Sequence, residues 1–132
     1  MRPARLPVGS RPILVVDDDE ALRRVLFWTL TDEGYSVMEA ADGAVALAWV
    51  REAAPGLILL DMRMPVMDGW AFARRYRARP GPHAPIVCVT AALDAAAVAA
   101  RGAQIGAVAS LSKPFDLEEL LALVRRYAPP PA

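Results

Sequence analysis

Three short apolar runs constrain the fold of this chain more than any other feature of its sequence. Residues 13–16, 57–60 and 86–89 are each four consecutive apolar residues without polar alternation. Such continuous runs are typical of strands that are buried on both faces of a parallel sheet. Because segments with helical character separate the runs, the pattern predicts an α/β protein with helices on both sides of its sheet.

Two weaker strands and five helices complete the predicted pattern. The more mixed run at 35–40 predicts an edge strand, and residues 108–112 predict a weak fifth strand. Right-handed crossovers between parallel strands then favour a doubly wound, flavodoxin-like (βα)5 fold, with five strands in the order 2-1-3-4-5. Helices are predicted after the capping residue Asp19 as far as Gly34, at about 43–53, at 70–77, from about residue 94, and from a capping box at Asp116 and Glu119 to Tyr127.

The chain length and the positions of proline predict one domain with two tails. A length of 132 residues fits a single domain. Proline is frequent near both ends, and Pro-rich ends lack the backbone donors of regular structure. We therefore predict a flexible N-terminal tail at 1–10, one folded domain at 11–127 and a Pro-rich C-terminal tail at 128–132.

Polar residues follow the predicted strands at the points where the strands end. Asp17 and Asp18 follow the first strand, Asp61 the third, Thr90 the fourth and Lys113 the fifth. In a doubly wound sheet, ligands bind beyond the carboxyl ends of the strands, where the strand order reverses. With the order 2-1-3-4-5 that point lies between strands 1 and 3, so the five residues are predicted to converge on one edge of the sheet.

The chemistry of this predicted site points to phosphoryl transfer assisted by a metal ion. Three neighbouring carboxylates raise one another's pKa unless a cation joins them, and oxygen ligands of this kind suit Mg²⁺. Lys113 adds an ammonium group, and Thr90 adds a hydroxyl group. Phosphoryl transfer depends mostly on charge neutralisation and positioning, and a carboxylate such as that of Asp61 can act as the nucleophile.

Four motifs at these strand ends resemble the receiver domain of bacterial response regulators. They are VVDD at 15–18, DMRMPVMDG at 61–69, VTA at 89–91 and KPF at 113–115, and the resemblance covers about residues 11–127. It implies a phosphorylatable switch of two-component signalling and phosphorelays, whose output is protein–protein contact. The chain would be a stand-alone, chemotaxis-type receiver or a receiver cut from a longer protein.

The resemblance also implies a role for each residue of the site. Asp61 would accept a phosphoryl group from a phosphohistidine on a sensor histidine kinase or a phosphotransfer protein. The chain would then be no enzyme, apart from the Mg²⁺-dependent self-phosphorylation and dephosphorylation of Asp61. By the same resemblance, the metal ligands would be Asp17, Asp18, Asp61 and the backbone carbonyl of Arg63, while Lys113 and Thr90 would contact the phosphoryl oxygens.

The sequence departs from the family at one position of the switch. Members usually carry Tyr or Phe three residues before the conserved lysine, where this chain has Ser110. The preceding Val108 and Ala109 stand where members that bind DNA carry acids for a salt-bridged dimer. We therefore expect a monomer that contacts an unknown downstream protein, without the usual relay from threonine to an aromatic ring.

The composition of the chain argues against several other classes of function. The 15 basic and 15 acidic residues give zero net charge, which favours neither nucleic acid nor an anionic membrane as partner. No apolar run approaches the roughly 20 residues of a membrane span. Cys88 is the only cysteine, which is typical of a reducing compartment. We expect a cytoplasmic protein with no nucleic acid and no membrane as its partner.

The sequence allows two other interpretations of the site. A phosphatase of the haloacid dehalogenase type also uses an aspartate nucleophile, Mg²⁺, a hydroxyl group and a lysine. That class places its nucleophile after strand 1 and normally needs a longer chain, whereas Asp61 follows strand 3; turnover of a phosphate ester would favour it. The second is a degenerate receiver that only binds a partner, and the complete set of acids, threonine and lysine argues against it.

The first predicted helix carries two aromatic residues on the side away from its apolar stripe. By helical periodicity Phe27 and Trp28 point outward, and two exposed aromatics on one helix suggest a docking patch. In the resembled family this helix contacts the phosphodonor protein. The predicted buried stripe is Leu22, Val25, Leu26, Thr29 and Leu30.

Overall fold

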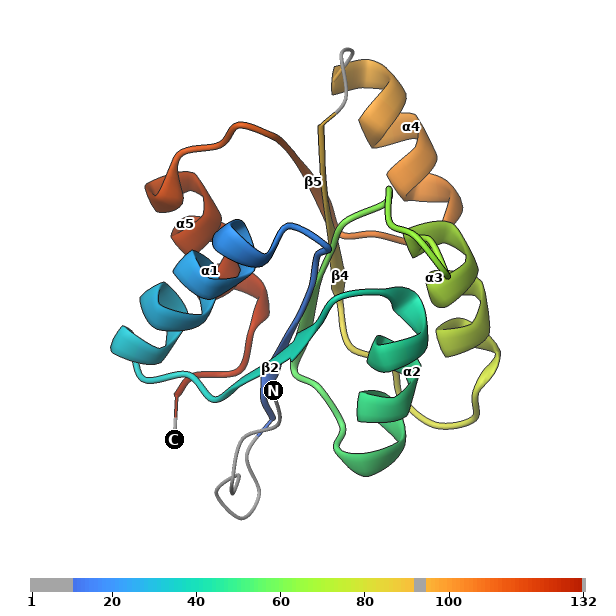
Figure 1. Ribbon diagram of the computed structural model, residues 1–132, viewed down its shortest axis with the longest axis horizontal. Helices are drawn as coiled ribbons and strands as arrows, with labels where there is room; N and C mark the ends of the chain where they lie inside the picture. Colours follow the sequence, from blue (N-terminus) through green and yellow to red (C-terminus); the bar gives the residue numbers. More distant parts are fainter. Residues whose placement is uncertain (1–10, 92–94, 132) are drawn as a thin grey trace.

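The computed structural model of the chain describes residues 11–91 and 95–131, leaving out the side chains of Thr90, Ala95, Ala97, Val98 and Arg101. Its centre is a five-stranded parallel sheet in the order β2-β1-β3-β4-β5, with helices on both faces (Figure 1). The strands are β1 (Ile13–Val16), β2 (Val37–Ala40), β3 (Leu57–Leu60), β4 (Ile86–Thr90) and β5 (Ala109–Ser112). The helices are α1 (Glu20–Asp32), α2 (Gly43–Glu52), α3 (Gly69–Ala78), α4 (Ala95–Gln104) and α5 (Leu117–Tyr127).

The predicted doubly wound α/β fold is confirmed, including the order of its strands. β1 and β3 cover the residues predicted for them, whereas β2 begins at Val37 rather than at residue 35. Helix ends differ from the predictions by a residue or two, which is the usual scatter at helix termini. Within residues 11–91 and 95–131, no helix combines the length and the apolar character needed to cross a membrane.

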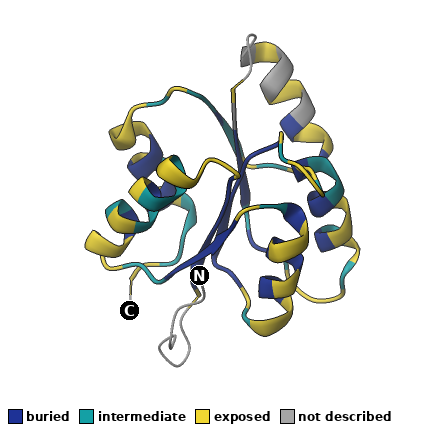
Figure 2. Cartoon of the chain, in the orientation of Figure 1, coloured by how far each residue is buried: buried dark blue, intermediate teal, exposed yellow. Residues whose placement is uncertain are grey.

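Two apolar layers lie between the sheet and its helices. Figure 2 shows that the strands at the centre are mostly buried, whereas the helices carry both buried and exposed residues. Ile13 belongs to the layer under α1 and α5, and the next residue, Leu14, belongs to the layer under α2 and α3. Every residue of β1, β2 and β3 is buried. The strands lack polar alternation for this reason, since successive side chains point to opposite faces and both faces are covered.

Aspartate side chains cap the amino-terminal ends of α1, α2, α3 and α5 at the carboxyl edge of the sheet. A side-chain oxygen at such a position satisfies one of the backbone N–H groups that the first helical turn leaves free. Asp116 caps α5, and its carboxylate accepts a hydrogen bond from the N–H of Glu118 at 2.8 Å. The predicted capping box required a bond from the N–H of Glu119 instead. The caps of α1, α2 and α3 are Asp19, Asp42 and Asp68.

The inward face of α1 differs from the predicted stripe. Val25 was expected in the core but is 47% exposed, and Phe27 packs partly against the apolar layer instead of pointing outward. The side chain of Arg23 faces inward, because it forms an ion pair with the buried Glu39 of β2. The predicted stripe is confirmed as buried at Leu26 and Leu30 only, while Leu22 and Thr29 are half-buried.

One aromatic side chain of α1 is exposed, as predicted. Trp28 is 59% exposed, and its ring meets that of Phe27 edge-on with 5.2 Å between the centroids. The guanidinium of Arg24 lies over both rings, at 4.8 Å from the centroid of Phe27 and 5.8 Å from that of Trp28. The outer face of α1 therefore carries one exposed aromatic ring, that of Trp28, which contacts the guanidinium of Arg24, rather than the two exposed rings that were predicted.

The loop between β3 and α3 contains a strained residue. Val66 has a φ of 68°, and the N–H of Met67 donates to the carbonyl of Pro65 at 2.7 Å, which defines a γ-turn centred on Val66. Positive φ is unfavourable for a β-branched residue, and γ-turns of this hand are rare. The carbonyl of Met67 accepts the N–H of Gly43 at 3.0 Å, so the turn docks onto the start of α2.

Replacing Val66 by glycine should stabilise the protein. Glycine adopts positive φ without a Cβ clash, which is worth about 1–2 kcal/mol, and part of this gain is offset by the greater entropy of glycine in the unfolded chain. We expect Val66→Gly to raise the free energy of unfolding by about 0.5–1 kcal/mol in urea denaturation.

Val66→Ala is the matched control, since alanine retains the Cβ that clashes at positive φ. Equal stabilisation by alanine would show that the side chain of Val66, which is 84% exposed, is unfavourable for another reason.

Candidate functional site

Four of the predicted site residues meet at the carboxyl edge of the sheet. Asp17 directly follows β1, and its N–H donates to the carbonyl of Ala40 at 3.0 Å. Asp61 directly follows β3, and its N–H donates to the carbonyl of Val16 at 2.9 Å. The parallel ladders therefore continue into both aspartates and fix their backbones side by side, as the strand order predicts.

Three carboxylates form a cluster at this edge. One oxygen from each of Asp17, Asp18 and Asp61 lies within 4.8 Å of the other two. Asp17 and Asp61 are 3% and 4% exposed, whereas Asp18 is open to solvent. A set made only of oxygen donors, with one side open to water, fits Mg²⁺, which usually takes one or two carboxylates and keeps several waters.

The ammonium of Lys113 joins two of these carboxylates. Its Nζ lies 2.7 Å from Oδ2 of Asp17 and 3.6 Å from Oδ2 of Asp61. Burial alone would lower the pKa of Lys113, but the hydrogen bond and charge of Asp17, together with the charge of Asp61, outweigh it and raise that pKa. Lys113 is therefore a permanent cation that offsets part of the negative charge of the cluster.

The carboxylate of Asp61 is poorly solvated, which perturbs its titration. Burial raises the pKa of Asp61 from 3.8 to about 6. The N–H of Arg63, which donates to Oδ1 at 3.1 Å, opposes this rise, as does the charge of Lys113, while the charge of Asp17 adds to it. At neutral pH Asp61 is mostly ionised but its charge is under-compensated, which favours a reaction or ligand that neutralises it.

The start of α3 approaches Asp61 so closely that only glycine fits there. A Cβ atom at Gly69 would lie 2.6 Å from the carbonyl oxygen of Asp61 and 2.8 Å from Cα of Met62. Both contacts involve backbone atoms, which cannot move without displacing Asp61. Asp68 and Gly69 thus have different roles. Asp68 caps α3, and Gly69 allows the start of α3 to pack directly against the backbone of Asp61.

Two predicted contributions to the site lie outside what these observations test. Thr90 ends β4 at the same edge, opposite Ser112 of β5, and its side chain is outside the described part of the structure. The N–H of Arg63 binds Asp61, and the role of its carbonyl as a metal ligand stays a prediction.

A buried ion pair beside the site was missed at the sequence level. Glu39 is 6% exposed on β2, and its carboxylate pairs with Arg23 and Arg24 of α1. Arg23 also donates to the backbone carbonyl of Asp17 at 2.8 Å. The available signal was an acid inside an otherwise buried strand, since a buried carboxylate requires a partner.

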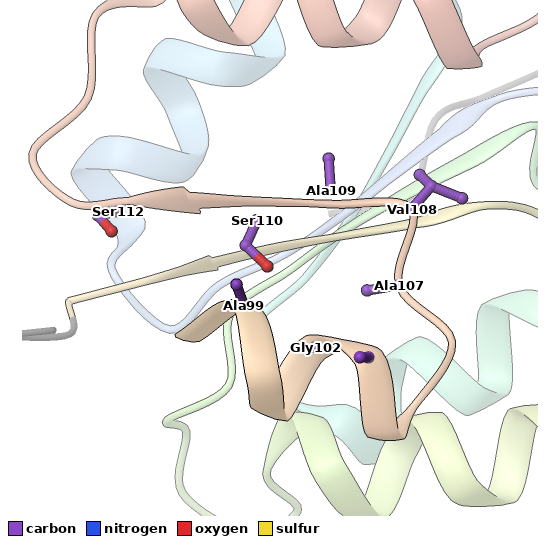
Figure 3. A pocket seen from close by; sticks show the side chains of 8 residues that line it. Ala99, Gly102, Ala107, Val108, Ala109, Ser110 and Ser112 are labelled. Atoms are coloured by element: carbon purple, nitrogen blue, oxygen red, sulfur yellow. The ribbon is translucent and has the colours of Figure 1, made fainter. Parts of the chain in front are cut away.

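Small residues line a groove between α4 and β5, where the predicted departure from the family lies (Figure 3). The groove measures about 290 Å³, and Ser110 points from β5 towards α4. A Cβ atom added at Gly102 of α4 would lie 2.8 Å from Oγ of Ser110. The small size of both residues therefore allows α4 to pack closely on β5.

Removing the charge of Asp61 should stabilise the metal-free protein. Between pH 3.8 and about 6 the folded chain holds the Asp61 proton more tightly than the unfolded chain, so this group lowers stability as the pH rises through that window. We expect Asp61→Asn to raise the free energy of unfolding by about 1–3 kcal/mol at pH 7.5 in a chelator, and by progressively less below pH 6.

The control is Asp32→Asn, which neutralises an exposed acid at the end of α1. Urea denaturation of the three proteins between pH 4 and 8 measures the effect. A gain for Asp61→Asn that grows as the pH falls would contradict the sign assigned to Asp61.

Comparisons with known proteins agree with this geometry. Residues 13–125 match the family described as "Response regulator receiver domain". Response regulator PleD of Caulobacter vibrioides is 44% identical over 117 residues, 88% of this chain and 26% of PleD. Response regulator MprA of Mycobacterium sp. (strain KMS) is 43% identical over 121 residues, 89% of this chain and 52% of MprA. The chain thus spans about half or less of the length of these curated relatives.

Solved structures show the same similarity. The chemotaxis response regulator CheY4 of Vibrio cholerae superposes with a TM-score of 0.81 at 35% identity, covering 90% of this chain and 99% of CheY4. A CheY-like receiver domain protein from Methanospirillum hungatei JF-1 superposes with a TM-score of 0.78 at 28% identity, covering 89% and 93%. The chain belongs to the response regulator receiver domain family of two-component signalling.

Proposed function

We propose that this chain is a phosphorylation-controlled switch in which Asp61 accepts a phosphoryl group. The observation that carries the proposal is the placement of the Asp61 carboxylate, which lies 3.6 Å from the ammonium of Lys113 and within 4.8 Å of ligand oxygens of Asp17 and Asp18. A nucleophile, a fixed cation and a cluster of oxygen ligands are the parts that phosphoryl transfer requires.

The proposed reaction transfers the group from a phosphohistidine to Asp61. An oxygen of the Asp61 carboxylate forms a bond to phosphorus, the bond between phosphorus and the imidazole nitrogen breaks, and its electron pair stays on the imidazole, which takes up a proton from water. Lys113 would offset the negative charge that the phosphoryl oxygens bring. The N–H of Arg63, bound to Oδ1, would hold the acceptor carboxylate in one orientation.

Mg²⁺ would be held by Asp17, Asp18, Asp61 and the carbonyl of Arg63. When bound, the ion would neutralise charge on the carboxylates and on the phosphoryl oxygens. The chain's own contribution is the orientation of these ligands: Oδ1 of Asp17 accepts the N–H of Asp19 at 2.9 Å, and Oδ2 binds Lys113. Thr90, at the end of β4, would contact the phosphoryl oxygens.

The partners proposed for the switch are proteins. A sensor histidine kinase or a phosphotransfer protein would supply the phosphoryl group, and an unknown cytoplasmic protein would receive the output. The exposed Trp28, braced by Arg24 on the outer face of α1, supports this helix as the contact for the donor. Membership of the receiver family disfavours the phosphatase interpretation, in which Asp61 would turn over many phosphate esters.

Incubation with acetyl phosphate and Mg²⁺ tests the proposal without a partner protein. Intact-mass spectrometry should show one added phosphoryl group on the wild-type chain, and none on Asp61→Asn or in the presence of a chelator. Asp32→Asn, which changes an exposed acid outside the site, should be labelled like the wild type. Equal labelling of Asp61→Asn would refute the assignment, and continuous release of phosphate over many turnovers would favour a phosphatase.

Phosphorylation of Asp61 should leave the chain a monomer. The surface of β5 and α4 that the structure describes offers Val108, 41% exposed, with Ala109 and Ser110, and no acid for a salt-bridged pair at the start of β5. Light scattering at micromolar protein, with Mg²⁺ and the phosphoryl mimic beryllofluoride, should give the monomer mass. A complete shift to the dimer mass on adding the mimic would show this expectation to be wrong.

A further inference from the structure

A single guanidinium connects the buried acid of β2 to the backbone of the acidic cluster. Nε of Arg23 lies 3.3 Å from Oε1 of Glu39, and Nη1 of the same side chain donates to the carbonyl oxygen of Asp17 at 2.8 Å. The side chain of Arg23 is 15% exposed and that of Glu39 is 5% exposed. Arg23 thus spans the gap between β2 and the point where β1 enters the site.

Glu39 is itself fixed from three directions. It pairs with Val15 in the ladder between β1 and β2, and its carbonyl accepts the indole N–H of Trp49 at 2.8 Å. Its second carboxylate oxygen, Oε2, binds Arg24 at 2.5 Å. A buried carboxylate held in this way is a rigid anchor, and the planar fork of arginine transmits that rigidity because its donors cannot move independently.

The carbonyl that Arg23 holds belongs to the peptide between Asp17 and Asp18, the two carboxylates that enter the cluster from β1. Rotating this peptide would redirect both side chains at once. In metal sites, groups that hold the ligands in place are often as important for affinity as the ligands themselves. Arg23 and Lys113 therefore hold different parts of Asp17. Arg23 binds its backbone carbonyl, whereas Lys113 binds its carboxylate.

We propose that Arg23 and Glu39 are positioning residues for the metal-binding carboxylates of Asp17 and Asp18. The inference rests on the proposed function and deepens it, because it concerns how this chain presents its ligands to Mg²⁺. Glu39 orients Arg23, and Arg23 holds the Asp17–Asp18 peptide in the orientation in which both carboxylates face Asp61.

Electrostatics alone makes the opposite prediction for Arg23. Removing a cation close to an acidic cluster should strengthen the binding of Mg²⁺, since one competing positive charge is lost. Loss of positioning should weaken binding instead. The direction in which Arg23→Met changes Mg²⁺ affinity therefore separates the two accounts.

The chain provides a matched control in Arg24, which pairs with the same carboxylate of Glu39 but is not bonded to Asp17. Arg24→Met removes the same charge and breaks the other ion pair of Glu39. The variants Arg23→Met, Glu39→Gln and Arg24→Met of the 132-residue chain would be titrated with Mg²⁺ by calorimetry. The Mg²⁺ concentration for half-maximal phosphorylation by acetyl phosphate and the rate at saturating Mg²⁺ would be measured in parallel.

We expect Arg23→Met to raise both the Mg²⁺ dissociation constant and the half-maximal concentration about ten-fold. Glu39→Gln should cause a smaller rise in the same direction, and Arg24→Met should stay close to the wild type. Arg24→Met should also preserve the rate at saturating Mg²⁺. In Arg23→Met the half-maximal concentration should change more than that rate does, since Arg23 is bonded to the backbone of Asp17 and not to Asp61. A purely structural role would lower the melting temperature without moving the half-maximal concentration.

Unchanged or tighter Mg²⁺ binding in Arg23→Met would overturn the inference, as would equal weakening in Arg23→Met and Arg24→Met. If Arg23→Met does not fold, Arg23→Lys serves in its place, because an ammonium keeps the charge but lacks the fork that makes both bonds. Absence of Mg²⁺ binding by the wild-type chain would overturn the proposed function itself and this inference with it, and that result is read before any variant.

Discussion

The repulsion between two buried carboxylates, those of Asp17 and Asp61, is the constraint on which the rest of the structure depends. Both are almost fully buried, and a third, Asp18, lies beside them. One ammonium, that of Lys113, faces them, and it lies closer to Asp17 than to Asp61. Burial is the main cause of the raised pKa of Asp61, and the charge of Asp17 adds to it, while Lys113 offsets only part of the rise.

The fold imposes this arrangement because it fixes the backbone on every side of the cluster. Asp17 and Asp61 are held by ladder bonds to β2 and β1, and Gly69 lets α3 press against the carbonyl of Asp61. Behind them, two apolar layers bury both faces of the sheet and supply the stability that offsets the repulsion. Because Lys113 neutralises only part of the charge of the three carboxylates, the cluster gains free energy from binding a further cation.

Much of this arrangement could be predicted from the sequence, because the fold has a strong local signature. Apolar runs such as 13–16 and 57–60 are too short and too continuous for amphipathic helices, so they predict buried strands. The strand order follows from right-handed crossovers between parallel strands. Asp61 and Lys113 could be placed together because parallel strands end at a common edge. The ends of strands β1, β3, β4 and β5 carry the polar residues, and the topology then brings these strand ends to one edge of the sheet.

The features that the sequence did not predict depend on pairing across elements. Helical periodicity predicted that Val25 of α1 is buried, but Val25 is exposed. Arg23 faces the sheet instead, because it pairs with the buried carboxylate of Glu39. A charged residue on the inward side of a helix contradicts the usual stripe unless its partner on the neighbouring strand is known. The γ-turn at Val66 is also invisible to pattern reasoning, since valine carries no preference for positive φ.

The proposed phosphoryl acceptor, the Asp61 carboxylate, can be identified directly. Reduction of the phosphorylated chain with borohydride converts an aspartyl phosphate to homoserine, which tandem mass spectrometry of the peptides can locate. We expect homoserine at position 61 and at no other acid, with none formed in chains that were never phosphorylated. Homoserine at position 17 or 18, or a labelled chain without homoserine at position 61, would contradict it.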